Sequence, residues 1–192
     1  MSTRDRMVDA AAYVMRTRGL ARATTKEIAK EAGFSEAALY KHFRDKTDLF
    51  LAVLNERVPS DFGVVLAGLA GLVGREPLAE VLERVARTAI AYYRETFPMA
   101  ASLYSEPQLL AAHRKALLER GAGPHRPRAA LAGYLAAEQA LGRLHPDADP
   151  VAAAQLLLGG CLQTAFLATF AAEPEPVDLP LVRTLVTGLN PP

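Results

Sequence analysis

Between residues 24 and 46 the chain carries a group of side chains that can form hydrogen bonds or salt bridges with a polyanion. Hydroxyl, imidazole and ammonium groups that can reach phosphate oxygens occur at Thr25, Tyr40, His42 and Lys46. Small or hydrogen-bonding side chains that suit the edges of base pairs occur nearby, at Ser35, Glu36, Ala37 and Lys41. The chemistry indicated by this segment is noncovalent recognition of nucleic acid.

Residue types that commonly carry catalysis or bind metals are sparse and widely spaced. His113, His125 and His145 have no second histidine at i+3 or i+4, and Cys161 is the single cysteine. The chain has no G-x-S-x-G elbow, no P-loop and no G-x-G-x-x-G motif. We therefore expect no enzymatic activity, no metal site and no cofactor.

The polar segment is predicted to form two short helices joined by a tight turn. Thr24 and Glu27 make the S/T-x-x-E capping box that opens the first helix, and Gly33 ends it. Ser35 can cap the second helix, which we expect to run through Phe43. Two short helices arranged in this way are typical of a helix-turn-helix.

Apolar residues give these two helices a small shared core, formed by Ile28, Ala29, Phe34, Leu39 and Phe43. A longer helix over residues 4–18 precedes them, because apolar residues recur there at helical spacing. Asp45 can cap the helix that follows. The sequence therefore predicts an N-terminal three-helix domain with a helix-turn-helix over residues 1–48.

Charge and proline content separate the front of the chain from the rest. The whole chain has a formal net charge of +1, but its first 60 residues hold 11 Lys and Arg against 8 Asp and Glu, which gives +3. The remaining residues therefore carry −2, and all 13 prolines lie at or after Pro59. We predict a basic N-terminal domain followed by a second helical domain, to which we assign residues 49–192.

No segment shows the apolar–polar alternation that predicts a strand. The second domain instead contains amphipathic helices that begin at or near prolines, which suit the first helical position. These helices are expected to open at Pro77, Pro107, Pro127, Pro150 and Pro180. The predicted fold class is all-α, with a C-terminal helical bundle and about nine helices.

The run TTKEIAKEAGFSEAALYKHFRDKTDLF, residues 24–50, resembles the DNA-binding domain of the TetR/AcrR family of bacterial transcriptional regulators. The most specific elements are TTKEIAKEAGFS and LYKHF followed by DKTDLF. Two positions depart from the family pattern: Ala37 stands where glycine is common, and Thr47 where an acid is common. The resemblance covers about residues 4–58, and beyond them only the all-helical layout agrees.

The resemblance implies a homodimer that binds a palindromic operator in double-stranded DNA and leaves it when a small molecule binds the C-terminal domain. By matching position, it places on phosphates the residues Thr25, Tyr40, His42 and Lys46. It directs toward bases the residues Ser35, Glu36, Ala37 and Lys41. A repressor is the expected role, and an activator with the same DNA-binding domain is the alternative.

Candidates for the small-molecule site combine apolar bulk with a few polar groups, as ligand pockets do. They lie on the middle helices: Tyr92, Tyr93, Phe97, Tyr104, His113, Glu138, Gln163 and Phe166. Aromatic residues at helical spacing belong to a core more often than to a pocket, so a structural role is the competing interpretation for each. For His113 the competing interpretation is a hydrogen-bonded core histidine.

Residues 151–172 contain no charged side chain over a length that can span a bilayer. Glutamine and threonine interrupt the segment, and its flanks are acidic, with no basic cluster to orient it. We therefore expect a helix buried in a bundle or against a partner rather than in a membrane. The family layout implies a dimer interface formed by this helix and residues 180–189, with Leu158, Gly159, Leu162 and Phe166 as candidates.

A single cysteine excludes an internal disulfide and favours a reducing compartment. The first 18 residues lack the pattern of a signal peptide, so we expect a cytoplasmic protein. An all-helical adaptor between proteins, whose N-terminal domain only resembles a DNA reader, is the alternative from another class. Binding to DNA separates the two interpretations.

Overall fold

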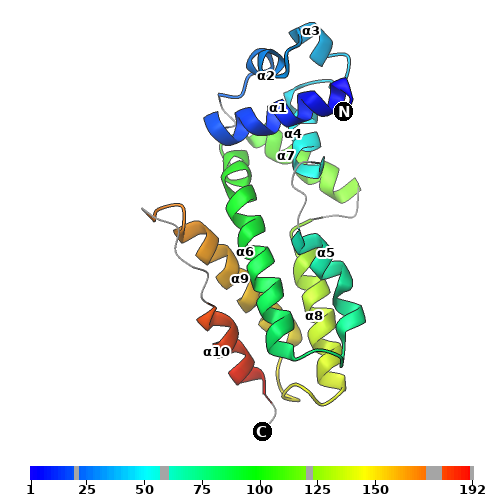
Figure 1. Cartoon of the computed structure of the whole chain (residues 1–192), viewed down its shortest axis with the longest axis vertical. Coiled ribbons are helices and arrows are strands. Elements are labelled where there is room, and N and C mark those ends of the chain that lie inside the picture. Colours follow the sequence, from blue (N-terminus) through cyan, green and yellow to red (C-terminus); the bar gives the residue numbers. More distant parts are fainter. Residues whose placement is uncertain (20–21, 57–60, 120–122, 172–178, 191–192) are drawn as a thin grey trace. The chain divides into compact units, whose positions relative to one another are not determined.

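The structure is a computed structural model that describes residues 1–19, 22–56, 61–119, 123–171 and 179–190. Over these residues it contains ten α-helices, one 3₁₀ helix and no strand, which confirms the predicted all-α class. The chain divides into two compact units (Figure 1). We call residues 1–59 with 95–122 the N-terminal unit, and residues 60–94 with 123–192 the C-terminal unit.

The N-terminal unit contains α1 (Thr3–Arg18), α2 (Thr25–Ala32), α3 (Glu36–Leu39), α4 (Lys46–Glu56), α7 (Pro107–Glu119) and the last part of α6 (Leu78–Leu103). Its core is continuous from α1 to α7. Met7, Ile28 and Phe50 are completely buried in it, and Leu109 of α7 packs against the same cluster.

We assigned residues 49–192 to the second domain, whereas the structure groups residues 49–59 and 95–122 with the helix-turn-helix. The reason lies in the apolar face of α4. Leu49, Phe50 and Val53 are buried in the same cluster as Ile28 of α2, so α4 completes the core that the first three helices leave open. Burial of these side chains is the main stabilising contribution that α4 can make.

The C-terminal unit contains α5 (Asp61–Gly68), a 3₁₀ helix (Leu69–Leu72), the first part of α6, α8 (His125–Ala140), α9 (Pro150–Leu167) and α10 (Pro180–Leu189). Leu82 of α6, Leu135 of α8 and Leu157 of α9 meet in its core and are fully buried. α8 packs along α9, and α10 lies on another side of α9 (Figure 1). One side of α9, which carries Leu156, Leu162 and Leu167, stays exposed and is not covered by this unit.

Most predicted helices begin where their caps indicate, but three elements differ. The helix α5 was not predicted, because apolar residues occur on all of its sides and give no 3.6-residue pattern. Phe62, for example, is buried, whereas Val64 is 74% exposed. α3 ends at Leu39 rather than Phe43, and the chain continues as turns. α9 ends at Leu167, and the predicted end at Ala172 lies outside the described residues.

Candidate nucleic-acid interface

Side chains cap both short helices at the predicted positions. Thr24 Oγ1 accepts a hydrogen bond from the Glu27 N–H at 3.2 Å, and the Glu27 carboxylate accepts from the Thr24 N–H at 3.4 Å. Ser35 Oγ accepts from the Ala38 N–H at 3.2 Å and so opens α3. The Thr24 N–H, together with the guanidinium of Arg18, lowers the pKa of the Glu27 carboxyl. These contacts satisfy backbone donors that each helix would otherwise leave unpaired.

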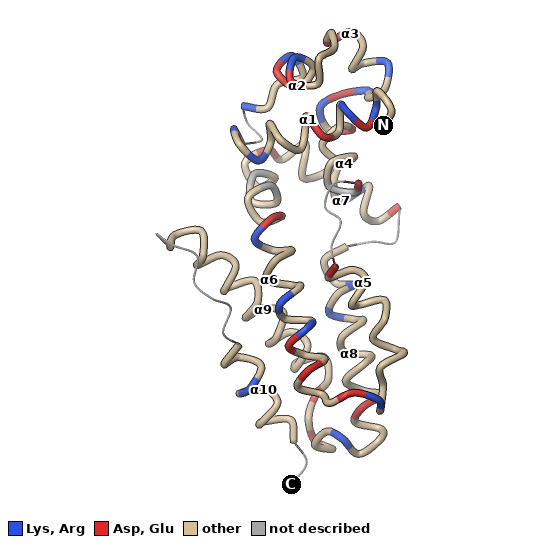
Figure 2. The backbone as a smooth tube through the Cα atoms, viewed as in Figure 1, with Lys and Arg blue, Asp and Glu red and all other residues tan. Residues whose placement is uncertain are grey.

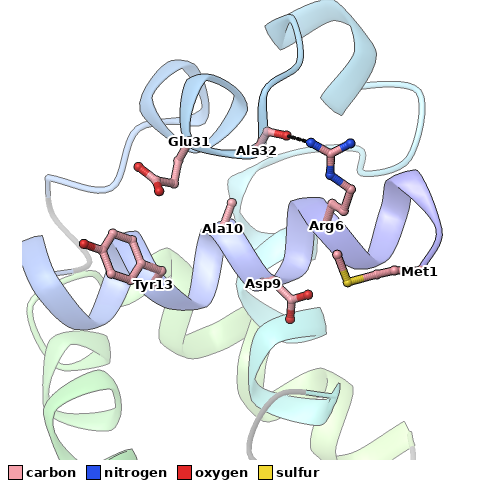
Figure 3. A pocket seen from close by; sticks show the side chains of 7 residues that line it. All are labelled: Met1, Arg6, Asp9, Ala10, Tyr13, Glu31 and Ala32. Carbon is pink, nitrogen blue, oxygen red and sulfur yellow. Dashed lines mark hydrogen bonds between the residues drawn. The ribbon is translucent and has the colours of Figure 1, made fainter.

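The turn between α2 and α3 is fixed by a glycine and by an arginine of α1. Gly33 has φ 76° and ψ 31°, a left-handed conformation that side chains oppose. Arg6 donates from Nη2 to the Ala32 carbonyl at 3.1 Å, as Figure 3 shows, and its guanidinium stacks 4.7 Å from the centre of the Phe34 ring. α1 therefore sets the angle of the turn as well as contributing to the core.

The predicted shared core is present. Ile28 and Leu39 are fully buried, Ala29 and Phe43 nearly so, and Phe34 is half-buried beneath Arg6. A further clamp comes from Arg4, which makes two hydrogen bonds of 2.7 Å to Glu56 and lies over the Phe43 ring. Sequence reasoning missed the roles of Arg4 and Arg6. Their partners lie 52 and 26 residues away, and no local pattern announces such pairs.

Three predicted site residues meet on the surface formed by α2 and α3. Thr25 Oγ1 donates to Glu36 Oε1 at 2.5 Å, and the same Oγ1 lies 3.3 Å from the hydroxyl oxygen of Tyr40. Tyr40 is 50% exposed, while Thr25 and Glu36 are half-buried. Hydrogen bonds therefore link Thr25 and Tyr40, which we predicted to contact phosphates, to Glu36, which we predicted to contact a base.

The other residues predicted to contact DNA lie on α3 or its cap, in the turns that follow it, and at the start of α4. The side chains of Ala37, Lys41 and His42 are exposed. Lys46 is the first residue of α4, and its Nζ lies 3.9 Å from Glu106 Oε1. The Lys46 ammonium therefore already has an acidic neighbour within its own unit.

A hollow of about 590 Å³ opens beside Glu36 and is lined by Lys26, Ala29, Lys30, Gly33, Phe34, Ser35 and Glu36. Lys26 and Lys30 lie one helical turn apart on α2, and both are exposed. We did not predict either lysine as a site residue, although the i, i+4 spacing places them on one face. A smaller pocket of about 280 Å³ between α1 and α2 contains none of the predicted site residues (Figure 3).

The predicted ligand residues of the N-terminal unit are Phe97, Tyr104 and His113. Tyr104 is 78% exposed, and Phe97 is half-buried. The His113 ring packs edge-on against Phe50 with 6.4 Å between ring centres, and burial lowers the pKa of His113. His113 therefore takes part in the packing of α7 on α4.

The predicted ligand residues of the C-terminal unit occupy different environments. Tyr92 and Tyr93 form an aromatic cluster with Phe62, with ring centres 5.6 to 6.1 Å apart, and burial raises the pKa of Tyr93 to about 12. Gln163 and Phe166 are exposed on α9. The ligand site as a whole stays a prediction.

Glu138, another predicted ligand residue of this unit, is completely buried. Its Oε1 accepts from the Gly74 N–H at 2.9 Å, and its Oε2 lies 3.0 Å from Arg143 Nη1. Arg143 in turn donates to the Glu76 carbonyl at 2.6 Å. Glu138 therefore ties the segment before α6 to the end of α8.

The predicted dimer residues divide between the two sides of α9. Leu158 is 7% exposed and packs in the core of its own unit, whereas Gly159 is exposed and Leu162 and Phe166 are 39% and 40% exposed. The close approach to α10 occurs at the next glycine: a Cβ on Gly160 would lie 2.4 Å from Leu181 Cδ2.

α9 is the one helix in the described part of the chain that is long and apolar enough to cross a membrane, and 33% of it is buried within the structure. It carries no charged residue, in contrast to α1 and α2, where both signs are frequent (Figure 2). No group of three or more His, Cys, Asp or Glu residues arranged to hold a metal occurs among the described residues.

A capped helix-turn-helix in one unit, combined with a second unit that is all-helical, is typical of regulatory DNA-binding proteins. Residues 7–53 match the model of bacterial regulatory proteins of the tetR family, and residues 80–186 match that of the AefR-like transcriptional repressor C-terminal domain. The second match spans more than half of the chain. The chain therefore belongs to the TetR family of bacterial transcriptional regulators, which confirms the predicted resemblance.

Three known proteins illustrate the similarity. Over 55 residues the chain is 42% identical to the HTH-type transcriptional regulator SrpR of Pseudomonas putida, a segment that is 29% of this chain and 26% of SrpR. A TetR-family regulator from Mesorhizobium loti superposes with a TM-score of 0.67 at 24% identity, covering 97% of this chain and 90% of that one. SmeT of Stenotrophomonas maltophilia, the repressor of the multidrug efflux pump SmeDEF, gives 0.61 at 25% identity, covering 97% and 87%.

Proposed function

We propose that this chain is a homodimeric, ligand-responsive transcriptional repressor that binds a palindromic operator in double-stranded DNA. The observation that carries the proposal is the helix-turn-helix: two capped helices joined by left-handed Gly33, with Thr25, Glu36 and Tyr40 gathered on its surface. Family membership supports the same function, since both matched models describe regulators of transcription. Such regulators act by binding, and we assign no enzymatic activity.

In this proposal Thr25, Tyr40, His42 and Lys46 hold phosphates, and Ser35, Glu36, Ala37 and Lys41 face base edges in the major groove. The exposure of Tyr40, Lys41 and His42 supports these roles. Ser35 uses a lone pair to cap α3, so its hydroxyl proton can still be donated. Phosphate contacts would fix the register of the protein, and base contacts would determine the sequence that is bound.

We assign the uncovered face of α9 to contact with a second copy of the chain. Leu156, Leu162 and Leu167 are 63%, 39% and 57% exposed there, on a helix without charge. Contiguous apolar surface of this kind marks an interface. A protein that binds DNA does not require a membrane-spanning helix, so we propose that the chain is cytoplasmic. We also propose that the exposed face of α9 is covered by a second copy of the chain and not by lipid.

A dimer would present two copies of α3 to successive major grooves, about 34–36 Å apart along the duplex. A small molecule that binds one dimer geometry more tightly than another would shift the population toward that geometry, by its differential affinity alone. The aromatic cluster of Tyr92 and Tyr93 with Phe62 is our candidate for one wall of the effector site.

Salt dependence of binding tests the proposal. Affinity for a random-sequence duplex of about 30 base pairs should fall linearly on a double logarithmic plot as salt rises, because each phosphate contact releases counterions. Lys46→Ala should reduce the slope by about one. Lys115→Ala is the matched control, because Lys115 lies on α7 and is 79% exposed beside Glu119. Absence of salt-dependent binding by the wild type would overturn the proposal, and an unchanged slope would remove Lys46 from the contacts.

A further inference from the structure

The hydrogen bonds around Thr25 have a defined direction. An ionised carboxylate only accepts, so the Thr25 hydroxyl proton points to Glu36 Oε1, 2.5 Å away. The Thr25 hydroxyl has a single proton, which is directed to Glu36. Thr25 Oγ1 can therefore only accept a hydrogen bond from the Tyr40 hydroxyl, 3.3 Å away. The hydroxyl protons of Tyr40 and Thr25 therefore point along one series of hydrogen bonds, from Tyr40 to Thr25 and from Thr25 to the Glu36 carboxylate.

This direction conflicts with the binding of phosphate. Phosphate oxygens are also acceptors, so they compete with Glu36 for the proton of Thr25. The carboxylate is half-buried, and Thr25 is its hydrogen-bond partner in the described part of the chain. The Thr25 hydroxyl proton is therefore already engaged when a phosphate approaches, and the negative carboxylate of Glu36 lies within hydrogen-bond distance of Thr25 and repels the phosphate.

A base donor that engages the Glu36 carboxylate offsets its negative charge and competes with Thr25 for its oxygens, which weakens the hold of Glu36 on the Thr25 proton. In the major groove, cytosine presents only a donor, its N4 amino group, whereas guanine presents two acceptors and thymine an acceptor and a methyl group. Adenine has an amino group, but its N7 acceptor lies beside it and repels a carboxylate. The base that suits Glu36 best is therefore cytosine.

The surroundings of Glu36 are consistent with DNA at this point. Glu36 lines the hollow together with Lys26 and Lys30 of α2. The two ammonium groups would attract a phosphate backbone to the hollow, while the carboxylate would oppose any sequence that gives it no donor.

We propose that Glu36 is a base-specificity gate, which holds the protons of Thr25 and Tyr40 away from phosphate until a cytosine amino group engages its carboxylate. The inference rests on the proposed DNA-binding function and goes beyond it by naming the base and the coupling between base and phosphate contacts. Thr25 is then a positioning residue for Glu36 as well as a phosphate ligand.

Selection from a pool of random-sequence duplexes tests the gate, with wild type, Glu36→Gln and Glu36→Ala compared after circular dichroism has verified their folding. Wild type should enrich cytosine at one symmetric position in each half-site. Glu36→Gln should change that preference to adenine, which glutamine contacts in a bidentate way. Glu36→Ala should lose about 5- to 150-fold of discrimination there and bind a random duplex about two- to fivefold more tightly.

The same base profile for wild type and Glu36→Ala would overturn the gate while leaving DNA binding intact. Enrichment of no sequence by the wild type would overturn both the gate and the proposed function. Thr25→Val and Thr25→Ser separate positioning from a simple phosphate contact. Thr25→Val should blur the base preference at the Glu36 position, and Thr25→Ser should restore it; uniformly weaker binding by Thr25→Val with an unchanged profile would contradict the coupling.

Discussion

On α2 and α3 of the N-terminal unit the surface side chains are polar and bond to one another, as Thr25, Glu36 and Tyr40 do. On α9 of the C-terminal unit the surface side chains are apolar, with Leu156 63% exposed on a helix that carries no charge. Both units bury an apolar core. The difference therefore lies in what each surface can bind: a charged, hydrogen-bonding partner in one case and an apolar one in the other.

A charge on the uncovered face of α9 should have the largest effect of the substitutions that we propose. We expect Leu162→Glu to weaken the dimer by about 4 kcal/mol, since burial of an unpaired carboxylate at an interface is costly. Sedimentation velocity should then show monomers. Leu141→Glu is the matched control, because Leu141 is 57% exposed beyond the end of α8. Dimers of Leu162→Glu with unchanged affinity would contradict the assignment.

The two units also use ion pairs differently. Glu138 is fully buried against Arg143, whereas the Arg4–Glu56 pair is exposed by 41% and 33%. Glu138→Ala should lower the free energy of unfolding by about 3 kcal/mol, because it removes the counter-ion of Arg143 and leaves the Gly74 N–H without a partner. Glu56→Ala should cost at most about 1 kcal/mol. Urea unfolding measures both, and equal losses would show that burial does not separate the two pairs.

Two adjacent glycines of α9, Gly159 and Gly160, have different surroundings. A Cβ on Gly160 would lie 2.4 Å from Leu181, while one on Gly159 meets nothing within 4 Å. Overpacking against Leu181 should cost Gly160→Ala about 1–3 kcal/mol, which outweighs a helix-propensity gain of up to about 1 kcal/mol. Gly159→Ala should stabilise the monomer by up to about 1 kcal/mol through helix propensity. Thermal melts of the two variants should shift in opposite directions.

The smallest expected effect is a pH dependence confined to the N-terminal unit. Burial lowers the pKa of His113 below its ordinary value of 6.5, so the unfolded chain binds a proton more readily than the folded one. The stability that the folded chain gains from a neutral, buried His113 is therefore fully present above pH 6.5 and is lost as the pH falls below that value. Tyr93 and Cys161, with pKa values raised to about 12, stay neutral in that range. His113→Leu should flatten the acid limb of the stability profile, and an unchanged limb would exclude His113 as its cause.

Much of the fold could be predicted because its signals are local. Capping by Thr24 and Ser35 and the turn at Gly33 need only residues within a few positions of each other, and the structure has all three. The extent of α9 and its two faces could not be predicted. A helix that is apolar on every side gives no period, so Leu158 and Leu162 look alike in sequence although one is buried and the other is 39% exposed.

The chemistry of the candidate site could be predicted only in part. Residue types led us to predict that Thr25, Glu36 and Tyr40 contact DNA, but they did not predict the hydrogen bond between Thr25 and Glu36, which are 11 residues apart. Likewise we predicted Glu138 as a polar group of a ligand pocket, whereas its hydrogen bond from the Gly74 N–H, 64 residues away, makes it a structural link. Such pairings depend on the packing of separate helices, for which the sequence carries no local signal.

We propose that the polar surface of α2 and α3 binds specific DNA sequences as part of a symmetric dimer. Selection of duplexes from a random pool by the full chain tests it most directly. We predict enrichment of an inverted repeat whose half-site centres lie about one helical turn apart, or a multiple of it. Recovery of a pool with no inverted repeat above the input would contradict the account.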